Sequence, residues 1–202
     1  MTFNNLPLYE LTIEESDGIQ FISIVDRPAI QSNFLCFADN IKYDFSVTDP
    51  DKHLVSGLAM IPDLPIYRQN EQGEFYVVFT TDTIKKLAEK FFNEQRTLSV
   101  NIQHQQPTND VVIIESYFID HKRNIVPIEF ADAPDGSWYV TMKINDETLW
   151  QSIKNGQFTG FSVEGFFDIK DIEVPPSPTA NEIKQIEELQ EDIYDIIYKI
   201  IK

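Results

Sequence analysis

The sequence holds little of what several protein classes require. A single cysteine, Cys36, excludes a disulfide framework and any zinc site built from cysteine thiolates. No stretch approaches the roughly 20 consecutive apolar residues that a membrane-spanning helix needs. Basic residues are few, 16 against 33 acidic ones, which gives a formal charge of −17. Such a charge argues against nucleic acid or an anionic membrane surface as the main partner.

What is present is enough apolar side chain for a folded core. Of the 202 residues 42% are hydrophobic, and 15 phenylalanines and eight tyrosines contribute to that fraction. Bulk disorder is therefore excluded. The first ten residues lack the basic and then apolar pattern of a signal peptide. Together these features predict an acidic, soluble protein of a reducing compartment.

One break in composition divides the chain. Three prolines within residues 175–178 block both a helix and a central strand, so we expect a domain over residues 1–170, a linker over 171–180 and an amphipathic helix over 181–202. In the last segment isoleucine and leucine recur at spacings of three and four, as in a short heptad seam. Docking onto its own domain, association with a second helix and fraying all remain open.

The main domain has the pattern of a β-rich α+β protein. One helix is expected after the capping cluster at 80–82 and another between Asp146 and Gly156. We expect the strands to form a mostly antiparallel, barrel-like sheet with the helices packed outside it. The strands are expected over residues 19–25, 42–47, 57–65, 74–79, 97–104, 111–119, 137–144 and 158–168.

Ser162 stands out in the last of these strands. It lies between Gly160 and Gly165 in an otherwise bulky run, where glycine marks a close approach of two backbones. The G-x-S-x-x-G spacing is one residue longer than the nucleophile elbow of α/β-hydrolases, and the strand-to-helix turn of that elbow is missing. An α/β-hydrolase is thus disfavoured, and a packing serine explains this residue as well as a nucleophile does.

His104 and Glu115 are each assigned by alternation to an apolar strand face. His104 ends the face of Val100 and Ile102, and Glu115 follows Ile113 on the next strand. If these two strands form a hairpin, His104 and Glu115 are neighbours. A buried carboxylate that orients an imidazole and stabilises its cation is what a weakly nucleophilic serine requires. A histidine satisfied within the core is the alternative.

Six runs give the sequence a resemblance to the phage prohead serine proteases of the XkdF type. In chain order they are SIVDRPAI at 23–30, GLAMIP at 57–62, PIYR at 65–68, NIQH at 101–104, IESY at 114–117 and GFSVEG at 160–165. The resemblance covers about residues 19–168. This family is distantly similar to the herpesvirus assemblins, which place a serine and a histidine on a barrel-like core wrapped by helices. The resemblance implies Ser162 as the nucleophile and His104 as the general base, with no metal and no cofactor.

The third catalytic residue is left open. Glu115 is the first choice, because it fits the expected hairpin and lies in the IESY run; Asp120 and His121 are alternatives, His121 because assemblins use a second histidine. The resemblance implies a serine endopeptidase that processes scaffold and major capsid precursors inside the prohead, in the host cytoplasm, and that is itself trimmed. The tail would associate with helical partners or form a homodimer. The competing expectation is a non-catalytic structural component of the viral head that retains the protease fold.

Overall fold

The computed structural model describes residues 2–4, 6–13, 17–27, 44–70 and 73–166. The expected linker over 171–180 and the expected helix over 181–202 lie outside the described residues, as does Cys36.

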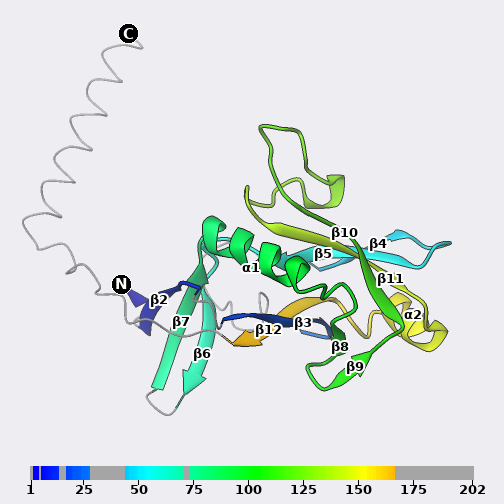
Figure 1. The fold of residues 1–202 in the computed structure, drawn as a ribbon, viewed down its shortest axis with the longest axis horizontal. Helices are drawn as coiled ribbons and strands as arrows, with labels where there is room; N and C mark the ends of the chain where they lie inside the picture. Colours follow the sequence, from blue (N-terminus) through cyan, green and yellow to red (C-terminus); the bar gives the residue numbers. More distant parts are fainter. Residues whose placement is uncertain (1, 5, 14–16, 28–43, 71–72, 167–202) are drawn as a thin grey trace, which may run out of the picture.

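The described strands form three sheets of four strands each (Figure 1). In spatial order, the β7 sheet contains β1 (Thr2–Phe3), β2 (Leu6–Leu11), β7 (Gly73–Phe79) and β6 (Ile66–Asn70). The β11 sheet contains β10 (Val111–Phe118), β11 (Trp138–Ile144), β5 (Leu54–Met60) and β4 (Ser46–Asp49). The β3 sheet contains β12 (Gly160–Phe166), β3 (Gly18–Val25), β8 (Val100–Ile102) and β9 (Gln106–Thr108).

The β-rich α+β class is confirmed, but the described strands do not close into a barrel. Each sheet is open, with two edge strands, and two of the strand pairs, β2 with β7 and β3 with β8, are parallel. The expected hairpin between residues 97–104 and 111–119 is wrong. Its first strand, β8, pairs with β3 and β9, whereas β10 pairs with β11 in a different sheet.

One cluster of buried apolar side chains connects all three sheets with both α-helices. Helix α1 (Thr81–Asn93) begins at Thr80, whose hydroxyl accepts a hydrogen bond from the backbone N–H of Thr83, as the capping cluster predicted. Its buried face contacts β3 and β11 (Figure 1). Helix α2 (Glu147–Lys154) begins at Asp146 and ends before Gly156, which has a positive φ. Neither helix has the length and apolar character that crossing a membrane requires.

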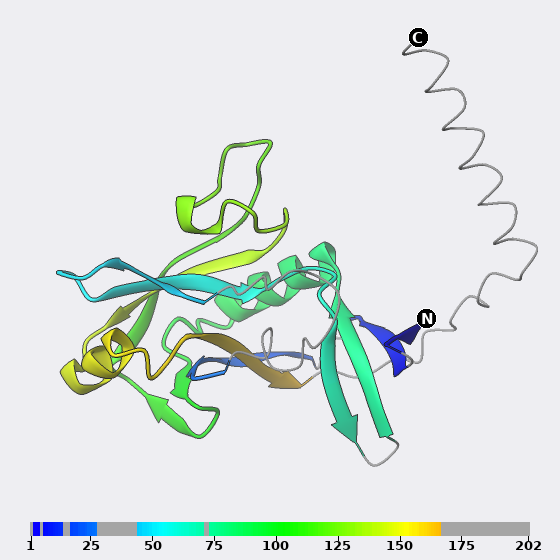
Figure 2. The same cartoon turned by 180° about the vertical axis from the view of Figure 1, so that it is seen from behind.

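Strand β11 shows the alternation that its sequence predicted. Trp138, Val140, Met142 and Ile144 are fully buried in the main core. Tyr139 lies on the opposite face of the sheet and packs in a second, smaller cluster with Leu58, Ile119, Phe130 and Ala133. The last three belong to the connection between β10 and β11, which carries the short helix η1 (Ile128–Phe130) and projects away from the β3 sheet (Figures 1 and 2).

Candidate active site

A row of three polar residues crosses the β3 sheet. Ser162 of β12 is the Cα partner of Ser23 of β3, and Ser23 is in turn the partner of Asn101 of β8. Directly paired residues present their side chains on the same face of a sheet. Neighbours such as Phe161 and Ile24 face the main core, so the polar row lies on the other face. The three residues are nevertheless only 4%, 0% and 3% exposed.

His104 lies in the turn after β8 and contacts this row at Ser23. Its Nδ1 atom lies 2.9 Å from the hydroxyl oxygen of Ser23. Gln105 N–H donates to the carbonyl of Ile102 at 3.1 Å, so Gln103 and His104 are the central residues of the tight turn between β8 and β9. The expectation that His104 extends a strand face is therefore wrong, because β8 ends at Ile102, two residues before the expected end of the strand.

The turn holds His104 in an unfavourable backbone conformation. Gln103 and His104 have φ values of 54° and 57°. Two consecutive positive φ angles are typical of a type I′ turn, where Asn-Gly is usual and bulky residues cost roughly 1–3 kcal/mol each. The side chain of Asn101 supports the turn by accepting a hydrogen bond from the backbone N–H of His104 at 3.1 Å. Strain that the surroundings maintain is common at functional sites.

Glu164 supplies the carboxylate at this histidine. Its Oε2 atom lies 3.3 Å from His104 Nδ1, an ion-pair distance when the imidazole is protonated. Asn101 Nδ2 donates to the same carboxylate oxygen at 2.9 Å and fixes its position. The His104 and Glu164 side chains are 41% and 42% exposed, so solvent partly screens the pair. Asn101 thus orients both the turn and the carboxylate.

Glu115 is not brought to His104. It lies in the β11 sheet, where its carboxylate accepts a hydrogen bond of 2.5 Å from the Thr141 hydroxyl. The pairing of β10 with β11 shifts register between Ile113 and Glu115, so a β-bulge places Glu115 opposite Thr141 rather than on the core face of Ile113. One extra residue in a strand reverses which face the following side chains occupy. The assumption that placed Glu115 beside His104 fails because β8 and β10 belong to different sheets, and the bulge in addition turns Glu115 away from the core face.

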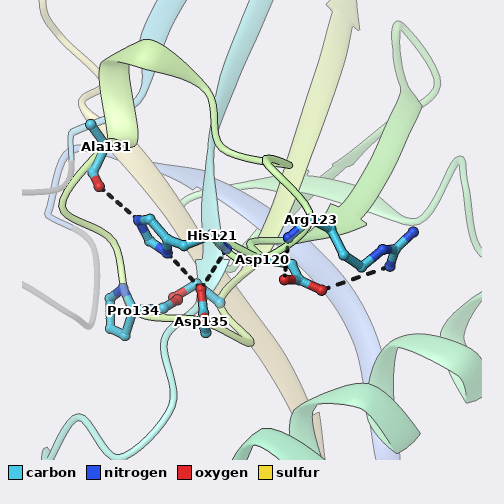
Figure 3. Close-up of polar contacts among 7 residues, drawn as sticks. Asp120, His121, Arg123, Ala131, Pro134 and Asp135 are labelled. Atoms are coloured by element: carbon cyan, nitrogen blue, oxygen red, sulfur yellow. Dashed lines mark hydrogen bonds and ion pairs between the residues drawn. The ribbon is translucent and has the colours of Figure 1, made fainter.

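The two alternative residues, Asp120 and His121, lie in the connection after β10 (Figure 3). Asp120 accepts a hydrogen bond from the backbone N–H of Arg123 and closes a local turn. His121 Nδ1 lies 2.5 Å from Asp135 Oδ1 and Nε2 lies 2.9 Å from the carbonyl oxygen of Ala131. Because both partners accept, both ring nitrogens carry protons. In this arrangement His121 has no lone pair with which to act as a base.

These contacts also shift the pKa values of His121 and Asp135. Hydrogen bonds to the Ala131 carbonyl and to the Asp135 carboxylate raise the pKa of His121 above its usual value. Hydrogen bonds from the backbone and side chain of His121 lower the pKa of Asp135. The His121–Asp135 ion pair therefore stabilises the connection between β10 and β11, and it is separate from the polar row.

Two concave surfaces lie close to the site, one lined by Ser162 and the other beside the His104 turn. Ser162 lines a small, mostly apolar pocket together with Met60, Ile66 and Arg68, so a residue that is largely buried still reaches a hollow of the surface. A larger, open groove runs between β9 and α2 and begins at Ile102 and Gln106, on either side of the His104 turn. Among the described residues, no group of three or more His, Cys, Asp or Glu side chains is placed to hold a metal ion.

Ser23, Asn101 and Glu164 were not identified from the sequence as site residues, although each had a signal. Glu164 is two positions from Ser162 in one strand and so shares its face. Ser23 and Asn101 each interrupt an apolar run, Ile22-Ser23-Ile24 and Val100-Asn101-Ile102. A polar residue in such a run needs a partner, but the sequence does not say that the two strands are adjacent.

Comparisons with known proteins agree with the motifs. Residues 44–171, which include His104, Ser162 and Glu164, match the family described as "Putative phage serine protease XkdF". The chain is 28% identical over 163 residues to the phage-like element PBSX protein XkdF of Bacillus subtilis (strain 168), covering 75% of this chain and 53% of that protein. It is 27% identical over 175 residues to the uncharacterized protein YqbD of the same strain, with 81% and 48% covered.

The chain spans about half the length of these two curated relatives. No solved structure matches it. The family match extends over more than half of the residues and contains five of the six runs in full, together with the histidine and the serine that those runs singled out. The chain therefore belongs to the XkdF family, as the resemblance of its motifs predicted.

Proposed function

We propose that the chain is a serine endopeptidase in which Ser162 is the nucleophile, His104 the general base and Glu164 the carboxylate that stabilises the imidazolium. One observation carries the proposal: Ser162, in the GFSVEG run, is in register with a buried hydroxyl that contacts a histidine held against a carboxylate. Serine is a weak nucleophile at neutral pH and needs a base of this kind.

The reaction would be an acyl transfer. The Ser162 hydroxyl oxygen attacks the carbonyl carbon of a peptide bond while His104 takes up its proton, and the same imidazole later returns a proton to the leaving amine. Glu164 lowers the free energy of the imidazolium that exists between these events. Backbone N–H groups beside the carbonyl would stabilise the oxyanion, typically by about 3–4 kcal/mol each.

As substrates we propose the scaffold protein and the major capsid precursor of a phage head, with the prohead interior in the host cytoplasm as the place of reaction. Two findings support this choice: the family is described as one of phage serine proteases, and the six sequence runs resemble those of prohead proteases. The tail over residues 181–202 would add association with a helical scaffold or with a second copy. Such tethering raises the effective concentration of substrate without changing the active site.

The test is cleavage of purified scaffold and major capsid precursor by the full chain. Ser162→Ala and His104→Ala are each expected to reduce cleavage to background. Ser56→Ala is the matched control, because Ser56 is also a buried strand serine but bonds Thr48 and Thr141 in the β11 sheet. That control is expected to cleave at close to the wild-type rate.

Unchanged cleavage by folded Ser162→Ala would overturn the proposal. Failure of the wild-type chain to cleave, while it still incorporates into heads, would favour the competing function of a non-catalytic head component with the protease fold.

The role of the tail has its own test. Deletion of residues 175–202 is expected to lower incorporation into heads and to leave hydrolysis of short peptides unchanged. Normal incorporation of the shortened chain would contradict the proposed role of the tail.

A further inference from the structure

Ser162 and His104 lie on opposite sides of β3. Ser162 belongs to β12, on one side of β3, and His104 follows β8, on the other side. Neighbouring strands are about 4.8 Å apart, so β12 and β8 are separated by about 10 Å. The ring nitrogen that faces the sheet, Nδ1, is engaged with Ser23 on the strand between them. The hydroxyl of Ser23 thus occupies the space that a proton must cross from Ser162 to His104.

We infer that Ser23 is a third catalytic hydroxyl, which relays the proton between Ser162 and His104. The inference rests on the proposed function, because it assumes that Ser162 is the nucleophile. Three observations carry it: Ser23 pairs directly with Ser162, its hydroxyl oxygen lies 2.9 Å from His104 Nδ1, and it is fully buried. Directly paired residues have Cβ atoms about 4.5–5.5 Å apart, so a rotation about χ1 brings two serine hydroxyls within hydrogen-bond distance.

Protons and electrons balance both when Ser162 attacks and when the tetrahedral intermediate collapses. As the bond from Ser162 Oγ to the carbonyl carbon forms, the Ser162 proton passes to Ser23 Oγ, the Ser23 proton passes to His104 Nδ1, and the carbonyl π electrons move to the oxygen. On collapse of the tetrahedral intermediate, Nδ1 returns a proton to Ser23 and Ser23 gives its own to the leaving nitrogen as the C–N bond breaks. Water then enters by the same route and releases the acyl group as a carboxylic acid.

Glu164 is placed to favour this direction of transfer. Its carboxylate lies 3.3 Å from Nδ1, the same atom that would receive the proton from Ser23. A carboxylate beside the accepting nitrogen stabilises the cation that the relay creates. Asn101 holds Glu164 there and, through the His104 backbone, holds the ring against Ser23.

The experiment measures the rate at which a fluorophosphonate labels Ser162 in the full chain, by intact mass over time and by mapping of the modified peptide. Labelling displaces fluoride from phosphorus and requires the same deprotonation of Ser162. Ser23→Ala is expected to slow labelling by about 100-fold or more, which is the usual contribution of a positioned proton acceptor. Ser56→Ala, the matched deletion of a buried strand hydroxyl, is expected to stay within about threefold of wild type.

A second pair of variants separates the hydroxyl from packing. Ser23→Thr and Ser23→Val place side chains of the same shape on β3, and only threonine keeps a hydroxyl. Threonine is expected to label at least about tenfold faster than valine, and this comparison stands even if Ser23→Ala does not fold.

The relay is overturned if Ser23→Ala labels Ser162 at close to the wild-type rate, if valine equals threonine, or if Ser56→Ala slows labelling as much as Ser23→Ala. These results leave the proposed function intact, provided that Ser162 itself is labelled. Absence of any adduct on Ser162 in the wild-type chain would instead remove the proposed function. An adduct on Ser23 in Ser162→Ala would make Ser23 the nucleophile and overturn both.

Discussion

Ser162 and Ser23 lie directly opposite each other on β12 and β3, and His104 contacts Ser23. The third strand, β8, adds Asn101 to the row, and Glu164 approaches the imidazole from β12. Three strands that are far apart in the sequence, together with the turn that follows β8, therefore contribute to one polar site. This arrangement predicts the effect of replacing individual side chains, and each prediction can be tested against a matched control variant.

The two candidate carboxylates can be separated by neutral replacements. Glu164→Gln removes the negative charge 3.3 Å from His104 Nδ1 and is expected to slow cleavage and fluorophosphonate labelling by about 100-fold or more. Glu115→Gln alters only the hydrogen bond with Thr141 in the other sheet and is expected to stay within about threefold of wild type. Initial rates of both variants at one pH provide the measurement. A slower reaction in Glu115→Gln than in Glu164→Gln would instead indicate that Glu115 is the carboxylate that assists His104.

Gly165 keeps Glu164 in place by allowing two backbones to approach. A Cβ atom at Gly165 would lie 2.3 Å from the carbonyl oxygen of Gly18, at the bulge between Glu164 and Gly165. Gly165→Ala is expected to lower the free energy of unfolding by about 1–3 kcal/mol, because the strands must separate to admit the methyl group. Urea denaturation measures this change.

Gly18→Ala is the control for that prediction. Its Cβ atom would meet only the flexible Lys90 side chain, at an ordinary 3.5 Å. We expect its free energy of unfolding to match wild type or to exceed it slightly. Equal losses in Gly165→Ala and Gly18→Ala would show that the close approach is not what requires glycine.

The His121–Asp135 pair predicts a dependence of stability on pH. The raised pKa of His121 gives a stabilisation that is complete below its ordinary value of 6.5 and is lost as the pH rises through the higher folded value. The lowered pKa of Asp135 gives a second stabilisation, which is complete above pH 3.8, the ordinary pKa of an aspartate. This stabilisation is lost as the pH falls through the lower pKa of the folded state. The pair therefore contributes most between pH 3.8 and pH 6.5.

The measurement is the free energy of unfolding of wild type and His121→Gln at pH 5.5 and pH 9. The difference between the two proteins is expected to be larger at pH 5.5. Lys122→Gln, which removes a neighbouring exposed cation, is expected to show no such difference. A difference in the free energy of unfolding between wild type and His121→Gln that does not change with pH would contradict this stabilisation by the ion pair.

Local features of the fold could be read from the sequence because they depend on residues close together in the chain. The alternation of Trp138 to Ile144 requires one buried face, and Thr80 and Asp146 cap helices through their own side chains. The glycine after Ser162 also matched its expected role, since Gly165 lies where two backbones nearly touch. For the strand alternation and the helix caps the physical cause acts within a few residues, whereas the backbone that approaches Gly165, at Gly18, is distant in the sequence.

The site could be predicted only in part, because its assembly depends on strand pairing. Nothing in residues 18–25 or 100–102 identifies β3 and β8 as parallel neighbours. The bulge at Ile114 and the turn at Gln103–His104 carry none of the glycine or asparagine signals that usually mark such irregularities. These two irregularities place Glu115 on another face and His104 in a turn, and the carboxylate that lies beside His104 is Glu164 rather than the expected Glu115.

The central claim is tested most directly by mapping where a fluorophosphonate attaches to the wild-type full chain. The account predicts one adduct, on the hydroxyl of Ser162, that disappears in His104→Ala while the folded state is retained. A modified residue other than Ser162, or an unmodified Ser162 in a preparation that cleaves capsid precursor, would contradict it.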